Sequence, residues 1–196
     1  MNTYNKIYSE NKNVFGLKPT AILETALKVV SNKSIALDIG AGQGRDTIFL
    51  AKSGFAVDSI EKSDVAINYL KSLNISKVNP IQTRVEDFDI VEDRYDLINA
   101  INVLQFVDDE NIPKVITKIR AGLRSGGVVV IASFTEEDPS FLEHSFKKYF
   151  SKSELKELFS GFEIIFYRED LVDDKPHGGS PYPHQHGIVE IVAMKG

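Results

Sequence analysis

The sequence predicts an α/β protein in which helices cover both faces of a mostly parallel sheet. Three observations support this fold class. Short β-branched runs alternate with segments of helical period, which favours right-handed βαβ units. A glycine-rich turn, "GAGQG", follows the first apolar run directly. The last two apolar runs have no helical segment between them, so they are expected to be antiparallel neighbours at the end of the sheet.

Composition limits the classes of protein that fit. The chain has 196 residues, with 42% hydrophobic and 26% charged residues, which suits one domain with a sizeable core. A net charge of −5 gives no electrostatic reason to expect a nucleic-acid or membrane partner. Since there are no cysteines, disulfides and thiolate metal sites are excluded. The polar start, "MNTYNKIYSENKN", does not have the apolar stretch of a secretory signal, so we expect a cytoplasmic protein.

The first part of the chain alternates strands and helices. Strands are predicted at Ser34–Ile39, Ala56–Ile60, Val78–Thr83, Tyr95–Ile101 and Val128–Phe134. Helices are predicted between them at Arg45–Ser53, Ser63–Leu73 and Asp109–Leu123. Gly126 and Gly127 are expected to form the turn that leads into the fifth strand.

The end of the chain departs from this alternation. A short helix is predicted at Ser153–Phe159, capped by Ser151 or Ser153. Two strands follow, "FEIIFYRED" and "HGIVEIVAMKG", which bring the predicted total to seven. The segment between them, "LVDDKPHGGSPYPHQ", is predicted to be a long loop, and long loops in compact domains are often functional.

The glycine turn is placed where a ligand would bind. In a parallel α/β sheet, ligands bind beyond the carboxyl ends of the strands. Gly40 and Gly42 would let the chain turn sharply and admit a ligand without a Cβ clash. The G-x-G-x-G spacing differs from the dinucleotide fingerprint. Asp38 precedes the turn and would repel a pyrophosphate, which favours a nucleoside with a positively charged tail.

Two acids follow the next two strands. Glu61 ends the second strand, where a carboxylate can accept hydrogen bonds from both ribose hydroxyls. Asp87 follows the third strand, where an acid can accept from an adenine amino group. Together with the glycines, these acids outline a nucleoside site along one edge of the sheet.

The motifs "LDIGAGQGRDT", Glu61, "VEDFD", "YDLINAINVLQFV" and "LRSGG" occur in an order and spacing that resemble the class I S-adenosylmethionine-dependent methyltransferases. Within that family, the chain is most similar to the small tellurite-resistance methyltransferases, which are close to the thiopurine-type group. The resemblance implies a Rossmann-like, doubly wound seven-stranded sheet with its last strand antiparallel. It also implies one domain over residues 1–196, with an N-terminal lid or helix at 1–33, a cofactor-binding core at 34–134, and a terminal helix and strand pair at 135–196.

The resemblance also assigns site residues for S-adenosyl-L-methionine. The methionine portion would be held at the end of the first strand, the ribose at the end of the second, and the adenine after the third. The end of the fourth strand would lie beside the methyl donor. In that order, the implied residues are Asp38, Gly40, Ala41 and Gly42; Glu61 and Lys62; Glu86, Asp87 and Phe88; and Ala100 and Asn102. Of these, Lys62 suits a plain surface position better than a ligand contact.

The methyl acceptor is predicted to be a small molecule or an oxyanion. The fourth-strand loop, "NAINVLQ", does not carry the Asn-Pro-Pro-Tyr signature of adenine-amino and glutamine-amide methyltransferases. His177, His184 and His186 are assigned to the acceptor side, because the start of an antiparallel last strand meets the ligand-binding edge. Their imidazoles could steer an anion, act as a general base, bind a metal or merely brace the loop. A His-x-His pair alone is a weak metal signal, so no metal ligand is assigned.

The N-terminal segment "YNKIYSENKNVFGLKP" is expected to fold over the site, with Tyr4 and Tyr8 as candidate contacts; a frayed terminus is the alternative. Two other functions stay open. A nicotinamide-dependent oxidoreductase would share the start of the fold, although the glycine spacing and the antiparallel end count against it. A non-catalytic S-adenosylmethionine-binding module would share the acids, and only turnover separates it from an enzyme. The oligomeric state stays open as well.

Overall fold

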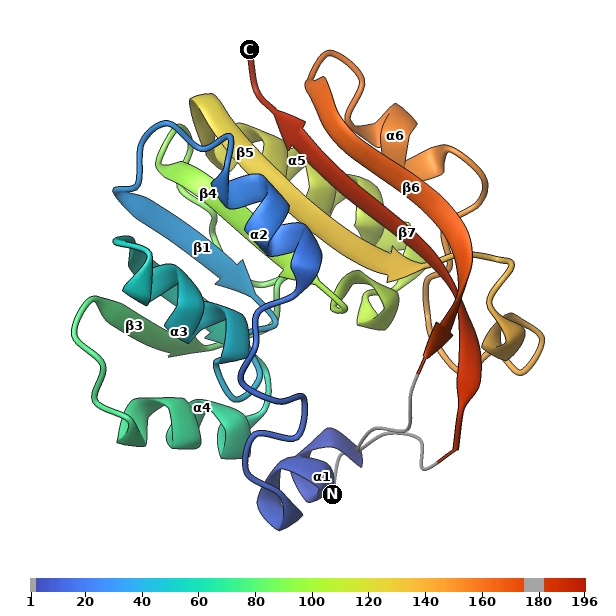
Figure 1. Cartoon of the computed structure of the whole chain (residues 1–196), viewed down its shortest axis with the longest axis horizontal. Coiled ribbons are helices and arrows are strands. Elements are labelled where there is room, and N and C mark those ends of the chain that lie inside the picture. Colours follow the sequence, from blue (N-terminus) through green and yellow to red (C-terminus); the bar gives the residue numbers. More distant parts are fainter. Residues whose placement is uncertain (1–2, 175–181) are drawn as a thin grey trace.

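A single seven-stranded sheet organises the chain, in the order β3-β2-β1-β4-β5-β7-β6 (Figure 1). The computed structural model describes residues 3–174 and 182–196. Every neighbouring pair is parallel except β5–β7 and β6–β7, so β7 alone runs against the others. The strands are β1 (Ile35–Ile39), β2 (Ala56–Glu61), β3 (Val78–Gln82), β4 (Tyr95–Ile101), β5 (Leu123–Phe134), β6 (Glu163–Asp174) and β7 (His184–Met194).

Helices precede the sheet and connect its parallel strands. Ser63 caps α4, because its side chain accepts a hydrogen bond from the amide of Ala66 at 3.2 Å. Pro113 stands in the first turn of α5, where its missing N–H costs nothing. The helices are α1 (Thr3–Glu10), α2 (Ala21–Leu27), α3 (Arg45–Lys52), α4 (Asp64–Ser72), α5 (Ile112–Gly122) and α6 (Glu154–Leu158), with short 3₁₀ turns at Leu104–Phe106, Asp109–Asn111 and Pro139–Phe141.

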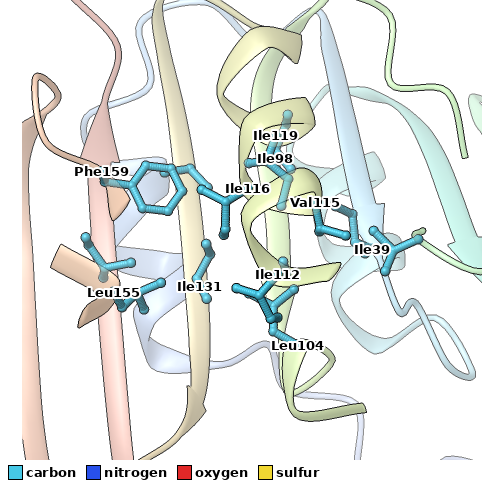
Figure 2. Packing of buried hydrophobic residues seen from close by; sticks show 14 of the residues in the cluster. Ile39, Ile98, Leu104, Ile112, Val115, Ile116, Ile119, Ile131, Leu155 and Phe159 are labelled. Carbon is cyan, nitrogen blue, oxygen red and sulfur yellow. The ribbon is translucent and has the colours of Figure 1, made fainter. Parts of the chain in front are cut away.

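Two hydrophobic clusters cover the two faces of the sheet. On one face, Ile116 and Ile119 of α5 and Phe159, which follows α6, pack against strand residues such as Ile98 and Ile131 (Figure 2). On the other face, α2 and α3 pack against β1, β4 and β5 in a separate cluster that includes Leu23, Leu50 and Leu97. The central strand β4 is buried along its whole length. This rigid double-sided core fixes the positions of the strand ends that form the site.

The structure confirms the predicted fold class and the reversed last strand, and it corrects some boundaries. β5 begins at Leu123 rather than Val128, because Leu123 already pairs with Tyr95 before the register shifts. The predicted long loop is shorter at both ends. β6 continues to Asp174 and β7 starts at His184, where these two residues pair. Ser153 occupies the N-cap position of α6, as predicted, but its side chain makes no capping hydrogen bond.

Among the described residues, no helix has the length and apolar character needed to cross a membrane. The expectation of a cytoplasmic location stays a prediction.

Candidate functional site

A cavity of about 880 Å³ lies at the carboxyl ends of β1, β2 and β4. Its walls include the glycine turn after β1, the end of β2, the loop after β4 and the N-terminal segment. The start of β7 also lines the cavity, through His184 and His186. The cavity therefore joins the predicted nucleoside site to the predicted acceptor side.

The glycine turn depends on left-handed backbone angles. Gly40 and Gly42 have φ values of +72° and +53°. The amides of Gly40 and Ala41 donate to the carbonyl of Ile60 at 2.9 and 3.0 Å, which ties the turn to β2. A Cβ at Gly42 would come within 3.0 Å of the Tyr8 hydroxyl. At Gly42 the absence of a side chain thus keeps open the space between the turn and α1.

A buried acid–amide pair links β1 and β4 at the cavity floor. Asp38 and Asn99 are neighbours in the parallel register, and both are 2% exposed. Asp38 Oδ1 accepts a hydrogen bond from Asn99 Nδ2 at 2.8 Å, and its Oδ2 accepts from the Thr47 hydroxyl. Burial, and secondarily the negative charge of Asp46, raises the pKa of Asp38 to about 7. The carboxyl group is therefore poised to change charge near neutral pH.

Glu61 holds the turn through its carboxylate. It is 8% exposed at the end of β2. Its two oxygens accept hydrogen bonds from the amides of Gly42 at 3.0 Å and Ser63 at 2.8 Å. Burial, and then the negative charge of Glu61, raises the pKa values of Tyr4 and Tyr8, so both phenols are neutral donors at physiological pH. A carboxylate of this kind can accept further hydrogen bonds from a ligand in the cavity.

The N-terminal segment covers the glycine turn and is fastened at two points. Gln43, which is buried, donates to the carbonyl of Asn11 at 2.8 Å and accepts from the amide of Val14 at 3.0 Å. Asn5 donates to Asp64 at 2.7 Å and accepts from the Ser63 hydroxyl at 2.6 Å, at the start of α4. In Figure 1, α1 lies on the side of the sheet toward which β1 and β5 point. Tyr4 and Tyr8 of this segment lie on the cavity wall, and its role as a lid stays a prediction.

A row of aromatic rings lines the cavity from α1 to β7. Tyr4 contacts Phe106 at 5.2 Å between ring centroids, and Phe106 contacts Phe146 at 5.4 Å. Phe146 contacts Phe134 at 4.9 Å, and Phe134 stacks on His186 at 4.7 Å. The row gives one wall of the cavity an aromatic surface and ends at the imidazole of His186.

The region after β3 is only partly at the cavity. Glu86 lines it and pairs with Arg84 at 2.5 Å. Burial alone would raise the pKa of Glu86. The hydrogen bonds that its carboxylate accepts from Arg84 and from the backbone together have the larger effect, so its pKa is lowered. Asp87 is exposed, and neither Asp87 nor Phe88 is among the residues that line the cavity. Phe88 packs against the core cluster that contains α5.

Eight of the eleven residues predicted for the cofactor line the cavity, and three do not. Those on its wall are Asp38, Gly40, Ala41, Gly42, Glu61, Lys62, Glu86 and Asn102. The other three are Asp87, Phe88 and Ala100, and Ala100 is fully buried in the core. The roles assigned to all eleven stay predictions, because a position on the wall does not identify a contact.

The histidines lie at the far end of the cavity. His186 Nδ1 contacts Asp138 Oδ2 at 2.8 Å, and His184 Nδ1 contacts the carbonyl of Tyr182 at 2.8 Å. The two Nε2 atoms face each other at 2.9 Å. Both rings therefore meet the same end of the cavity, as the antiparallel last strand predicts. His177 lies outside the described residues.

Sequence reasoning missed three residues that shape the site: Asn99, Gln43 and Asp138. Asn99 could have been found, since the parallel register of β1 and β4 places it beside Asp38. Gln43 lies inside the glycine turn, but nothing in the sequence shows that it reaches residues 11 and 14. Asp138 follows β5 by four positions, and only the folded loop brings it to His186.

The residues at the strand ends fit a nucleoside with a cationic tail. Asn99 Oδ1 is buried and has no hydrogen-bond partner among the described residues, although Asn99 is on the cavity wall. An unpaired buried carbonyl beside a buried carboxyl group suits an ammonium group, which only donates. Glu61 suits a pair of hydroxyls, because its carboxylate oxygens can accept the hydrogen bonds that the hydroxyls donate. These features match S-adenosylmethionine better than a pyrophosphate.

The strand order, the reversed last strand and this cavity define the fold of the class I S-adenosylmethionine-dependent methyltransferases. The family described as "Tellurite resistance protein TehB" matches residues 3–177. The chain belongs to this family, which confirms the resemblance found in the sequence.

Individual relatives agree with this assignment. A protein of Haemophilus influenzae, described as a probable S-adenosyl-L-methionine-dependent methyltransferase TehB, is 29% identical over 150 residues, covering 74% of this chain and 51% of the relative. The crystal structure of TehB from Haemophilus influenzae superposes with a TM-score of 0.78 at 22% identity, over 98% of this chain and 67% of that one. A methyltransferase structure from Methanosarcina mazei gives a TM-score of 0.70 at 17% identity, over 91% and 99% of the two chains. The chain spans about half the length of the first curated relative.

Proposed function

We propose that this protein transfers a methyl group from S-adenosyl-L-methionine to a small acceptor. The observation that carries the proposal is the convergence of Asp38, Glu61 and Asn99 from three strand ends on one cavity. Family membership supports the same activity, since the Haemophilus influenzae relative is described as a probable S-adenosyl-L-methionine-dependent methyltransferase.

Each strand end supplies one part of the cofactor site. Asp38 and Asn99 present acceptor oxygens that would hold the amino group of the methionine portion. Glu61 would accept hydrogen bonds from the ribose, and Lys62 lies next to it on the wall. Arg84 and Glu86, after β3, bound the region proposed for the adenine. The glycine turn supplies space rather than side-chain contacts.

The protein's task is to position two reactants and exclude water. When bound, the cofactor would supply an electrophilic methyl group on a positively charged sulfur. Transfer to a nucleophilic acceptor then depends mainly on in-line placement. Tyr4, Phe106 and Phe146 would exclude water from the path, because their rings form a continuous wall. α1, fastened by Asn5 and Gln43, would keep this wall closed over the glycine turn.

The acceptor proposed is a small anion or soft nucleophile, such as a chalcogen oxyanion or a thiol. The cavity extends from the cofactor region to His184 and His186, whose imidazoles can contact an anionic group. The name of the family, tellurite resistance, supports an acceptor of this kind. A large polymeric acceptor is less suitable, because the histidine end of the site lies within the cavity.

Release of S-adenosylhomocysteine tests the proposal directly. The full chain is incubated with S-adenosylmethionine and, separately, tellurite, selenite, simple thiols and small amines. We expect release with at least one tellurium, selenium or sulfur compound, and a large loss of activity in Glu61→Ala. Glu92→Ala, which removes an exposed carboxylate elsewhere, is the matched control and should keep full activity. No release with any compound, despite measured cofactor binding, would favour the non-catalytic module.

A further inference from the structure

The far end of the cavity holds a cluster of groups whose close approach to one another the methyl-transfer proposal does not explain. Asp174, His184 and His186 each offer one ligand atom, and these atoms lie within 4.8 Å of one another. The sheet register creates the cluster, since Asp174 pairs with His184 and Val172 pairs with His186 across β6 and β7. All three side chains line the cavity. The cluster is thus held on paired strands and opens toward the proposed acceptor position.

The hydrogen bonds of the two imidazoles determine which ring atoms face each other. His184 Nδ1 meets a carbonyl oxygen of Tyr182, and His186 Nδ1 meets a carboxylate oxygen of Asp138. Both oxygens can only accept, so each Nδ1 carries the hydrogen and each neutral ring keeps its lone pair on Nε2. Those two Nε2 atoms are 2.9 Å apart. Two lone pairs at this distance repel unless a cation lies between or beside them.

Asp138 supplies the outer support that metal-binding histidines use. Its side chain is 1% exposed and also accepts hydrogen bonds from the amides of Gly187 at 3.1 Å and Ser140 at 2.8 Å. A carboxylate that holds the Nδ1–H of a ligating histidine fixes the ring and makes its Nε2 a better ligand. A carboxylate, the imidazole that it holds and an Nε2 atom without a hydrogen are therefore in place before any ion is considered.

We propose that Asp174, His184 and His186 bind a divalent cation of the zinc class. Two imidazole nitrogens and one carboxylate are a ligand set that Zn²⁺ accepts, with a fourth position left for a ligand from solution. With Zn–N bonds of about 2.0–2.1 Å, tetrahedral coordination needs the two Nε2 atoms about 3.3 Å apart. The present 2.9 Å separation reaches that value by a small rotation of either ring.

The fourth coordination position of the ion faces the cavity. A molecule bound in the cavity could therefore serve as the fourth ligand. A small anion with a soft or oxygen donor, a thiolate or a chalcogen oxyanion, would bind the ion there. This role as an acceptor site rests on the proposed methyl transfer, whereas the binding of the ion does not. Cation binding and cofactor binding can therefore be measured independently.

The test uses the full chain, stripped of metal with a chelator and titrated with Zn²⁺ alone by calorimetry. We expect one equivalent to bind, and Co²⁺ to give visible absorption bands that Zn²⁺ abolishes. His184→Asn and Asp174→Asn should each weaken Zn²⁺ binding by at least tenfold. Asp138→Asn, which alters only the outer support, should weaken it by about 10–100-fold.

Matched controls separate this site from adventitious binding. His144→Asn and Asp173→Asn replace exposed side chains outside the cluster and should leave the Zn²⁺ affinity unchanged. Thermal unfolding with and without Zn²⁺ checks that each variant is folded, and affinity for S-adenosylhomocysteine should stay at the wild-type value in all of them. The proposal is overturned if the wild type binds no Zn²⁺, in which case a proton shared between the two rings explains their close approach. It is also overturned if the cluster variants bind Zn²⁺ as tightly as the control variants do.

Discussion

Replacing Asp38 by asparagine should change how the stability of the protein depends on pH. The carboxyl group is buried between β1 and β4, and burial raises its pKa from the ordinary value of 3.8 to about 7. The folded state therefore holds this proton more tightly than the unfolded state does. The resulting stabilisation is complete below pH 3.8 and is lost as the pH rises through about 7.

The pKa shift fixes the size of the effect. A difference of about three units corresponds to about 4 kcal/mol, and about 3 kcal/mol of it is lost between pH 5 and pH 8. For a domain of this size, that loss lowers the unfolding midpoint by roughly 5–10 °C. Asp38→Asn removes the titrating group and should remove this part of the pH dependence. The new side-chain amide of residue 38 can be accommodated. Asn99 Oδ1 has no partner among the described residues, and a rotation of the Asn99 side chain lets it accept a hydrogen bond from that amide.

The assay is thermal unfolding of wild type, Asp38→Asn and a matched control, Asp89→Asn, at several pH values from 5 to 8. Asp89 is exposed, so its variant should keep the wild-type slope. We expect the wild-type midpoint to fall relative to that of Asp38→Asn as the pH rises. Parallel curves for the wild type and Asp38→Asn would refute the reasoning, since they would mean that Asp38 stays ionised throughout the range.

Three further changes test other parts of the site. Gly42→Val should weaken S-adenosylhomocysteine binding at least tenfold in a protein that still folds, because φ there is +53° and the added side chain would crowd α1; unchanged affinity would contradict the role of the turn. Gln43→Ala should lower the free energy of unfolding by about 0.5–1.5 kcal/mol, because the partly buried amide of Val14 loses its acceptor. Exposed Gln82→Ala is its control in denaturant unfolding, and equal midpoints would show that the fastening is unimportant. Replacing His184 and His186 together with asparagine should leave cofactor affinity within about threefold, or about 0.65 kcal/mol, while kcat/KM for the acceptor falls far more. Normal turnover would show that the rings only brace the strands.

The fold could be predicted because each element carries its own local signal. Buried β-branched runs define β1, β2, β4 and most of β5. Because helical segments alternate with these strands, the expected arrangement is a parallel sheet with helices on both faces. One of the boundaries that failed, the start of β5, depends on how Leu123 pairs with Tyr95 across a register shift. No local pattern shows that pairing.

The site could be predicted only where residues act through their place on a strand end. Gly42 lies in the turn after β1 and Glu61 is the last residue of β2, and the structure places both on the cavity wall. Asp87 is exposed and does not line the cavity, whereas the neighbouring Glu86 does. Asp138 reaches His186 only through the folding of the loop after β5, a long-range contact that local sequence does not encode.

The central claim is that the cavity binds the nucleoside of S-adenosylmethionine through the carboxylate that ends β2. Calorimetric titration of the full chain with S-adenosylhomocysteine tests it most directly, with Glu61→Ala and the exposed control Glu92→Ala measured alongside, and NAD as a second ligand. The account predicts that the wild type and Glu92→Ala each bind one equivalent of S-adenosylhomocysteine and no NAD. Glu61→Ala should bind S-adenosylhomocysteine at least tenfold more weakly, which corresponds to about 1.4 kcal/mol. Equal affinity in Glu61→Ala, or tighter binding of NAD than of S-adenosylhomocysteine, would contradict it.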